Sequence, residues 1–232
     1  MSRRTAFTAG VLFLVTFAAA VAALLLYDPV LHRPDYVLGP GEDGRIALGA
    51  LLELVLAAAN IGTALVLLPL LRRQSEALAF GYVAARVLES TVIVVGIVSV
   101  LSVVSLRRLG QDATDAGALL VAARALVAVH DWTFLLGPNF VAGLGNGLIL
   151  GWLLRRSGAV PPRLTLLGLI GGPLVCLSGI GVLFGLHTQT SPTAGVLALP
   201  EMLWEAGLGV VLVVQGVRSS STVRSRASSS TA

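Results

Sequence analysis

The chain alternates between long apolar stretches and short polar segments, and the apolar stretch recurs six times. Each stretch holds about twenty or more mostly apolar residues, the length of a helix that crosses the roughly 30 Å hydrocarbon core of a bilayer. The stretches run from Ala6 to Leu26, Ile46 to Leu71, Ala77 to Leu106, Trp132 to Leu154, Leu164 to Leu186 and Val196 to Val217. They predict an all-α protein, a polytopic transmembrane helix bundle of six spans that forms a single domain over residues 1–217. The lipid bilayer is therefore its expected environment.

A further apolar segment, Ala116 to Asp131, precedes the fourth span and carries charges. Arg124 and Asp131 are seven residues apart, so they share one helix face. This pattern favours an interfacial amphipathic helix over a seventh span. A span from Ala116 to Leu136 would leave only about eighteen residues for the next crossing, and it would move the last arginines to the opposite side.

The two ends of the chain differ from this repeating pattern. Ser2-Arg3-Arg4 before an apolar stretch resembles an export signal, but the stretch is longer than the roughly 7–15 residues of a cleaved signal. We therefore expect a retained first helix that ends near Tyr27, Asp28 and Pro29. The tail, residues 218–232, consists mainly of Ser, Thr and Arg and is predicted to be disordered and cytoplasmic.

The basic residues are all arginines, sixteen in number, and most of them flank the spans. If the N-terminus is cytoplasmic and six helices alternate, ten arginines fall on the cytoplasmic side and four on the other. The ten are Arg3, Arg4, Arg72, Arg73, Arg155, Arg156, Arg163, Arg218, Arg224 and Arg226, and the four are Arg33, Arg45, Arg107 and Arg108. By the positive-inside rule, this asymmetry predicts a multi-pass protein of the cell inner (cytoplasmic) membrane with both termini in the cytoplasm. It also accounts for the net charge of +4 without a nucleic-acid partner.

Composition narrows the chemistry further. Hydrophobic residues make up 56% of the chain and the mean hydropathy is +0.89, which excludes a sizeable soluble domain. The single cysteine, Cys176, lies within an apolar stretch, so neither an intramolecular disulfide nor a cluster of thiolate metal ligands can form. No cofactor and no metal site are predicted.

Several short motifs follow one another in a particular order along the chain. They are Arg4-Thr5-Ala6, Glu53 with Asn60, Leu71-Arg72-Arg73 followed by Gly81-Tyr82, Arg86 with Glu89, Leu136-Gly137-Pro138-Asn139, the turn from Arg155-Arg156-Ser157 to Pro161, and Pro200-Glu201 through Glu205 to Gly216. In this order they resemble a bacterial family of six-helix integral membrane proteins, domain of unknown function 4386. The resemblance covers nearly the whole chain apart from the tail. It implies the six-helix fold and brings no established activity.

Polar side chains inside the spans are the main pointers to function, because a charge in hydrocarbon costs at least a few kcal/mol and usually faces the bundle interior. Counting about 1.5 Å of helix rise per residue from the span boundaries puts five of them within about 5 Å of the bilayer midplane. These five are Asn60, Arg86, Glu89, Asn146 and Glu205. We expect Glu53, Arg86, Glu89 and Glu205 to form one buried polar network that opens toward the outer side. Together with Asn60 they are the predicted ligand-binding residues.

Charge balance adds a constraint on this network. The same count of helical rise puts Glu53 and Glu201 about 10 Å from the bilayer midplane, toward the outer face. Because one arginine would face as many as four carboxylates, some carboxylates must be protonated or must bind a cation. The alternative is that the charges only hold the helices together, and that Glu201 and Glu205 are solvated near the outer interface.

Small residues and prolines suggest where helices approach or bend. Gly143, Gly147 and Gly151 recur every four residues, and the pairs Gly168 with Gly172 and Gly181 with Gly185 repeat this spacing. Such ridges form flat faces for close contact within the bundle or between the subunits of a homo-oligomer. A break at Gly137-Pro138-Asn139 would free backbone carbonyls, as in the discontinuous helices of transporters, although a simple kink also fits.

The residues give no convincing catalytic set. His130-Asp131-Trp132 could orient an imidazole, but adjacent helical residues do not face each other, so an interfacial anchor is the preferred interpretation. The leading hypothesis is a non-enzymatic membrane protein whose Glu/Arg cluster binds a small ligand, a proton or a cation. The alternatives are a structural, interaction or sensory membrane subunit without a ligand site, and an intramembrane enzyme that acts on a lipid substrate.

Overall fold

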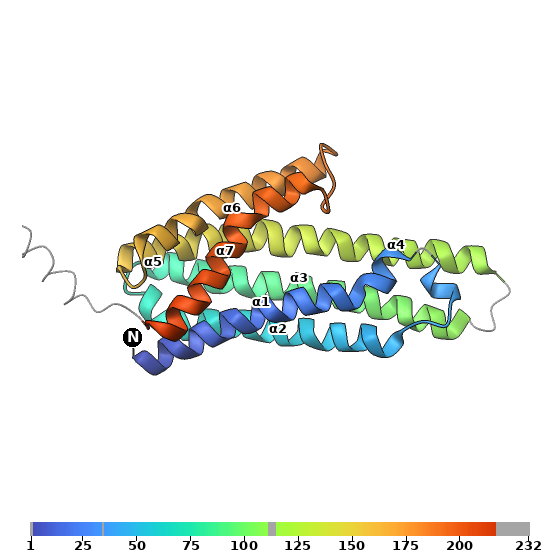
Figure 1. The fold of residues 1–232 in the computed structure, drawn as a ribbon, viewed down its shortest axis with the longest axis horizontal. Helices are drawn as coiled ribbons and strands as arrows, with labels where there is room; N and C mark the ends of the chain where they lie inside the picture. Colours follow the sequence, from blue (N-terminus) through green and yellow to red (C-terminus); the bar gives the residue numbers. More distant parts are fainter. Residues whose placement is uncertain (1, 34, 111–114, 217–232) are drawn as a thin grey trace, which may run out of the picture.

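The computed structural model describes residues 2–33, 35–110 and 115–216, and these residues form a helical bundle (Figure 1). Within them, six helices are long and apolar enough to cross a membrane. They are α1 (Arg3–His32), α2 (Asp43–Leu71), α3 (Glu76–Leu109), one continuous helix over Ala116–Ser157, α6 (Pro162–Leu183) and α7 (Pro192–Val214). The prediction of an all-α fold with six membrane spans is confirmed, and the chain is a multi-pass membrane protein. The predicted disordered tail, residues 218–232, lies outside the described residues.

Short polar side chains fix where four of the helices begin. Ser2, Ser75, Asp115 and Ser191 each accept a hydrogen bond from the backbone N–H three residues later. This bond satisfies one of the backbone donors that a helix leaves free in its first turn. The starts of α1, α3, α4 and α7 are therefore encoded locally.

The first helix is longer than predicted, because it continues through Pro29 to His32. Proline has no backbone N–H, so it cannot donate to the carbonyl oxygen of Leu25 four residues earlier. The guanidinium of Arg45, at the start of α2, donates to that oxygen instead at 2.7 Å. This contact replaces the missing helical bond and explains why the helix does not end at the proline.

The fourth long helix changes its winding along its length. It begins as α4 (Ala116–Phe134), becomes π-helical in η3 (Leu135–Val141) and η4 (Gly143–Leu150), and ends as α5 (Gly151–Ser157). The prediction of a separate interfacial helix before the fourth span is wrong, because α4 continues into that span without interruption. Gly137-Pro138-Asn139 lies within η3, so this segment is π-helical and does not break the helix.

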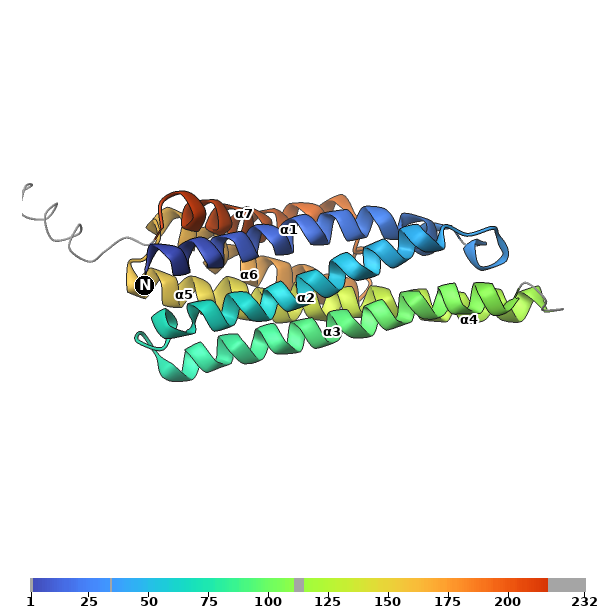
Figure 2. The same cartoon turned by 90° about the horizontal axis from the view of Figure 1, so that it is seen from below.

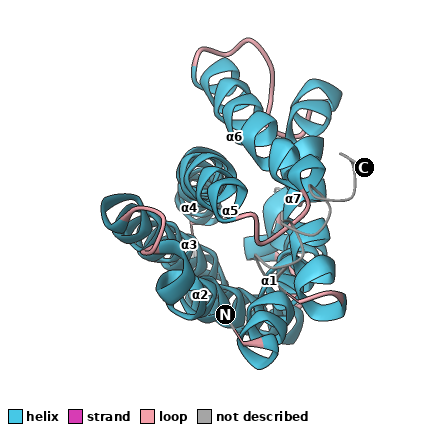
Figure 3. Ribbon diagram, turned by 90° about the vertical axis from the view of Figure 1, so that its left-hand side faces the viewer, coloured by secondary structure: helices cyan, strands magenta, loops and turns pink. Residues whose placement is uncertain are grey.

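The helices run roughly along one direction and differ in reach (Figures 1 and 2). We call the end that holds the N-terminus the N-terminal end, and the opposite end, which holds η1 (Tyr36–Leu38), the distal end. Gly216 lies beside Arg3, so the last described residues return to the N-terminal end. The α6–α7 pair stops well short of the distal end, where only the α3–α4 pair and the segment around η1 continue. Seen from the N-terminal end, α4–α5 lies between α2 and α3 on one side and α6 and α7 on the other (Figure 3).

Glycines allow several of these helices to touch closely. A Cβ atom at Gly172 of α6 would collide with the carbonyl oxygen of Gly143 in η4, and one at Gly171 would lie 2.5 Å from the backbone nitrogen of Glu201 in α7. A Cβ at Gly10 of α1 would lie 2.7 Å from the carbonyl oxygen of Gly209. The ridges around residues 143–147 and 168–172 therefore pack inside the chain, and a homo-oligomer would have to use other faces.

Two apolar clusters form much of the interior, one toward each end of the bundle. The cluster nearer the N-terminal end includes Phe13, Leu67 and Trp204, and the distal cluster includes Tyr36 and Val100. Burial of these side chains holds the ends of the bundle together.

The distal end carries its own ion pairs. Asp43, the first residue of α2, accepts hydrogen bonds from Arg107 at 2.5 Å and from Arg108 at 2.8 Å. Arg107 also donates to the carbonyl oxygen of Pro40 at 2.8 Å, and Tyr36 donates its hydroxyl hydrogen to Asp43. Burial, together with the nearby Asp43 carboxylate, raises the pKa of Tyr36 above its ordinary value, so this phenol stays protonated. These contacts, which we call the distal clamp, tie the loop before α2 to the end of α3.

Candidate functional site

Arg86 is the centre of a buried hydrogen-bond network. Its side chain is only 1% exposed, and it reaches α2, its own helix α3, and α7. It donates to the Glu89 carboxylate at 2.8 Å, to the side-chain amide oxygen of Asn60 at 3.3 Å and to the Glu205 carboxylate at 3.3 Å. The Asn60 amide in turn donates to Glu89 at 3.0 Å. Three helices are thereby cross-linked around one guanidinium, which desolvation makes costly unless it is fully paired.

A second set of contacts fixes Glu205 on the side of η4. The side-chain amide of Asn146 donates to Glu205 at 2.5 Å, and the indole N–H of Trp204 donates to the backbone carbonyl of Asn146 at 3.1 Å. Aromatic rings complete the packing of the guanidinium, because Phe13 and Tyr82 each have their ring centroid 5.7 Å from its central carbon. These contacts keep Arg86 in one orientation. The cluster of Asn60, Arg86, Glu89, Asn146 and Glu205 is called the Arg86 cluster below.

Glu53 belongs to a different group. Its carboxylate accepts a hydrogen bond from the Tyr27 hydroxyl of α1 at 3.0 Å, and it makes no ion pair among the described residues. The ring of His130 from α4 packs edge-on against the ring of Tyr27, with centroids 5.7 Å apart. His130 is 5% exposed, and its Nδ1 has no hydrogen-bond partner within the described part of the chain. Tyr27, Glu53 and His130 are called the distal trio below.

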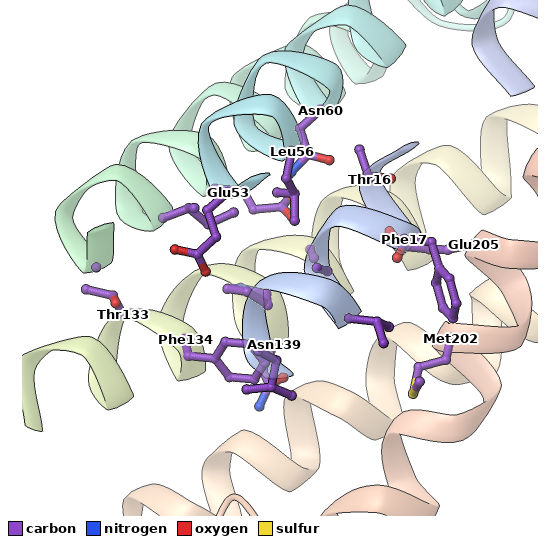
Figure 4. A pocket seen from close by; sticks show the side chains of 18 of the residues that line it. Thr16, Phe17, Glu53, Leu56, Asn60, Thr133, Phe134, Asn139, Met202 and Glu205 are labelled. Atoms are coloured by element: carbon purple, nitrogen blue, oxygen red, sulfur yellow. The ribbon is translucent and has the colours of Figure 1, made fainter. Parts of the chain in front are cut away.

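One cavity connects the distal trio with the Arg86 cluster (Figure 4). It has a volume of about 330 Å³ and lies between α1, α2, α3, the fourth long helix and α7. In Figure 4, Glu53 lies on one side of it and Glu205 on the other. Most of its wall is apolar, with side chains such as Phe17, Leu56 and Ile93.

The charges on the wall are unbalanced. The wall contains the four carboxylates Glu53, Glu89, Glu201 and Glu205, and no arginine occurs among the described residues that line it. Arg86 lies behind the wall and compensates only Glu89 and Glu205. Glu201 is 7% exposed, and neither of its carboxylate oxygens has a hydrogen-bond partner in the described regions. A buried carboxylate without a partner is costly, so this one requires either a proton or a ligand group.

Four of the five predicted site residues come together, and one does not. Asn60, Arg86, Glu89 and Glu205 are in direct contact. The prediction that Glu53 joins Arg86 in one network is wrong, since Glu53 bonds Tyr27 and meets the others only through the shared cavity. The suggestion that Glu201 is solvated is also wrong, because α6 and η4 cover it.

Sequence reasoning also missed two residues that line the cavity, His130 and Tyr27. His130 was assigned to the membrane interface, yet it is buried against Tyr27, while the two residues that follow it, Asp131 and Trp132, are exposed. Tyr27 was treated as the end of the first span. The spacing of Phe13, Thr16 and Tyr27 could have indicated that Tyr27 faces the interior. These residues are three and eleven positions apart, so they lie on one face of α1.

The polar groups on the cavity wall determine its chemistry. No group of three or more His, Cys, Asp or Glu side chains suitable for a metal ion occurs in the described ranges. The polar groups on the wall are carboxylates, a phenol, an imidazole and amides, which accept protons or bind cations and hydrogen-bond donors. The hydrogen bonds of the Arg86 cluster leave its guanidinium no free face toward the cavity.

Comparison with known proteins agrees with the fold. The family described as Domain of unknown function (DUF4386) matches residues 8–216, which is most of the chain. The chain belongs to this family. The match includes every residue of the Arg86 cluster and of the distal trio, so the cavity lies wholly within the DUF4386 region. No curated protein and no solved structure matches the chain.

Proposed function

We propose that this protein binds a small amphipathic cation in its internal cavity, with the cationic group beside Glu201 and Glu205. The observation that carries the proposal is the unbalanced wall, in which four carboxylates face the cavity while the compensating arginine lies behind it. A cation would supply the missing partner of Glu201, and an apolar body would fill the space beside Phe17, Leu56 and Ile93.

The rim of the cavity supports entry of the ligand from the lipid. Val21 and Leu24 of α1, Phe134 of α4 and Met202 of α7 line the cavity and are also between 40% and 49% exposed. Exposed apolar side chains of a membrane-spanning helix face lipid. A ligand that partitions into the bilayer could therefore reach the cavity sideways, between α1 and the helices opposite it.

The proposed orientation puts both termini in the cytoplasm and the cavity in the outer half of an inner membrane. The turn with Arg72 and Arg73 and the turn after Arg155 and Arg156 both lie at the N-terminal end, which supports a cytoplasmic location of that end.

Binding of octylammonium tests the proposal. We expect the purified protein in lipid nanodiscs to bind octylamine at pH 7 with a saturable calorimetric signal, after subtraction of empty nanodiscs. Glu201→Gln should weaken this binding about tenfold or more, because a hydrogen bond to a charged group contributes about 1.5–3 kcal/mol. The uncharged 1-octanol should bind equally to both proteins.

Glu76→Gln is the matched control, because Glu76 is exposed in the first turn of α3 and remote from the cavity. Absence of saturable octylamine binding, or equal binding by wild type and Glu201→Gln, would refute the proposal. Absence of octylamine binding would favour the alternative in which the buried charges only hold the helices together.

A further inference from the structure

The distal trio lines the cavity but has no role in the proposed binding of a single cation beside Glu201 and Glu205. Glu53 has one oxygen bonded to Tyr27, and its other oxygen has no hydrogen-bond partner among the described residues. Glu53 and His130 both line the cavity, and the buried His130 makes no hydrogen bond through its Nδ1, which lies 3.6 Å from the Asp131 carboxylate. The side chain of Glu53 points into the cavity (Figure 4). These are the features of a site that lacks its ligand group.

The trio and the Arg86 cluster are separated along the bundle. Glu53 and Asn60 are seven residues apart on α2, which corresponds to about 10 Å along the helix axis. Glu89 bonds Asn60 directly, so the inner carboxylates begin at that depth. The wall between the two levels includes Leu56 of α2 and Ile93 of α3, which are apolar. The cavity thus has an acidic group at each end and an apolar middle.

We infer that the distal trio is a second cation-binding subsite, and that the cavity accommodates an elongated dication with two amino groups about 10 Å or more apart. One ammonium group would bind Glu53, with Tyr27 and His130 around it, and the other would bind beside Glu205, which shares Arg86 with Glu89. The alkyl chain between them would contact Leu56 and Ile93. This inference rests on the proposed function and adds the class of ligand, a linear α,ω-diamine.

Stereochemistry sets the expected length of the ligand. A fully staggered chain of eight carbons separates two terminal nitrogens by about 11 Å. Diamines with much shorter chains cannot reach both acidic groups, and much longer chains must bend inside the cavity. A series from 1,4-diaminobutane to 1,12-diaminododecane, each compared with the monoamine of equal carbon number, therefore measures the spacing.

We expect the gain of diamine over monoamine to peak near eight to ten carbons and to reach about tenfold there, because the second ammonium group adds a charged hydrogen bond and about 1.4 kcal/mol corresponds to a factor of ten in affinity. Glu53→Gln should abolish this gain, so that diamine and monoamine of equal carbon number bind the variant with similar affinity. His130→Phe, which keeps an aromatic ring against Tyr27, should reduce the gain only in part.

Two results would overturn the inference. One is a diamine affinity that only rises with chain length, since partition into an apolar space explains it. The other is an equal loss of monoamine and diamine binding in Glu53→Gln.

The peak in the wild-type series decides the question even if a variant fails to fold. The proposed function is judged separately, because it depends on octylamine and Glu201 alone, whereas absence of binding by both amines refutes both.

Discussion

At the scale of single residues, Arg86 dominates the interior. It is an arginine buried to 1% exposure, held by two carboxylates, an amide oxygen and a phenol. Removal of one partner from a buried charge pair costs more than the pair contributes, because the remaining charge stays desolvated. Arg86 is therefore expected to be essential for folding even though it lies outside the cavity wall.

The substitution Arg86→Met tests this role. It leaves Glu89 and Glu205 uncompensated and should lower the free energy of unfolding by about 3–5 kcal/mol, measured by thermal unfolding in detergent. Addition of Glu89→Gln and Glu205→Gln should restore part of the loss, because it removes the unpaired charges. Arg73→Met, at an exposed position in the turn before α3, should change stability by less than about 0.5 kcal/mol. Wild-type stability of Arg86→Met would contradict the interpretation.

At the scale of helices, small residues decide which elements touch. α6 approaches η4 and α7 through Gly143, Gly171 and Gly172, and this approach covers Glu201. The buried carboxylate therefore depends on backbone contacts between helices as well as on its own surroundings. A wider spacing of α6 would admit other groups to Glu201 and change the site.

Gly172→Ala should disturb this packing. Its added methyl group would meet the carbonyl oxygen of Gly143 and lie 3.1 Å from the Cα of Gly147, so neither backbone can yield easily. We expect a loss of about 1–3 kcal/mol in unfolding free energy, typical of an overpacked contact. Gly195→Ala is the control, since a Cβ there has no atom within 4 Å. Similar stability of the two variants would show that α6 is not held this closely.

At the scale of the whole molecule, the long helices differ in length, and the longest exceed the thickness of a bilayer. α3 has 34 residues and the fourth long helix has 42. At 1.5 Å per residue these lengths are about 51 and 63 Å, against about 40–45 Å for a bilayer including its headgroups. We therefore expect the distal part of the α3–α4 pair to extend beyond the membrane, and there the distal clamp joins α3 to the loop before α2.

Loss of the clamp should loosen that loop. Asp43→Asn removes the carboxylate that pairs with Arg107 and Arg108, and Arg107 would remain largely buried without an ionic partner. We expect amide hydrogen–deuterium exchange of residues 36–39 to speed up at least tenfold, which corresponds to about 1.4 kcal/mol. Asp35→Asn, at an exposed position in the same loop, should leave exchange unchanged. Unchanged exchange in Asp43→Asn would show that the loop is held by apolar contacts alone.

These three scales explain which features the sequence can predict. Hydropathy predicts the six spans because lipid is a uniform apolar solvent, and the depth of Asn60, Arg86, Glu89 and Glu205 follows from counting helical rise. The partner of Glu53 depends on how α1 is rotated about its axis, which apolar residues on all sides of that helix do not specify. The error over α4 has a similar origin, since the charges of Arg124 and Asp131 suit a helix that leaves the membrane as well as one that lies on it.

The depth of Glu201 has an electrical consequence. If the N-terminal end faces the cytoplasm, as proposed above, that side of the membrane is at the negative potential, and a cation that moves from the outer solution to Glu201 crosses part of the membrane's electric field. A full crossing corresponds to about 2.3 kcal/mol per elementary charge at 100 mV. The resting voltage of the cell would therefore draw such a ligand inward and hold it, and a depolarised membrane would release it more readily.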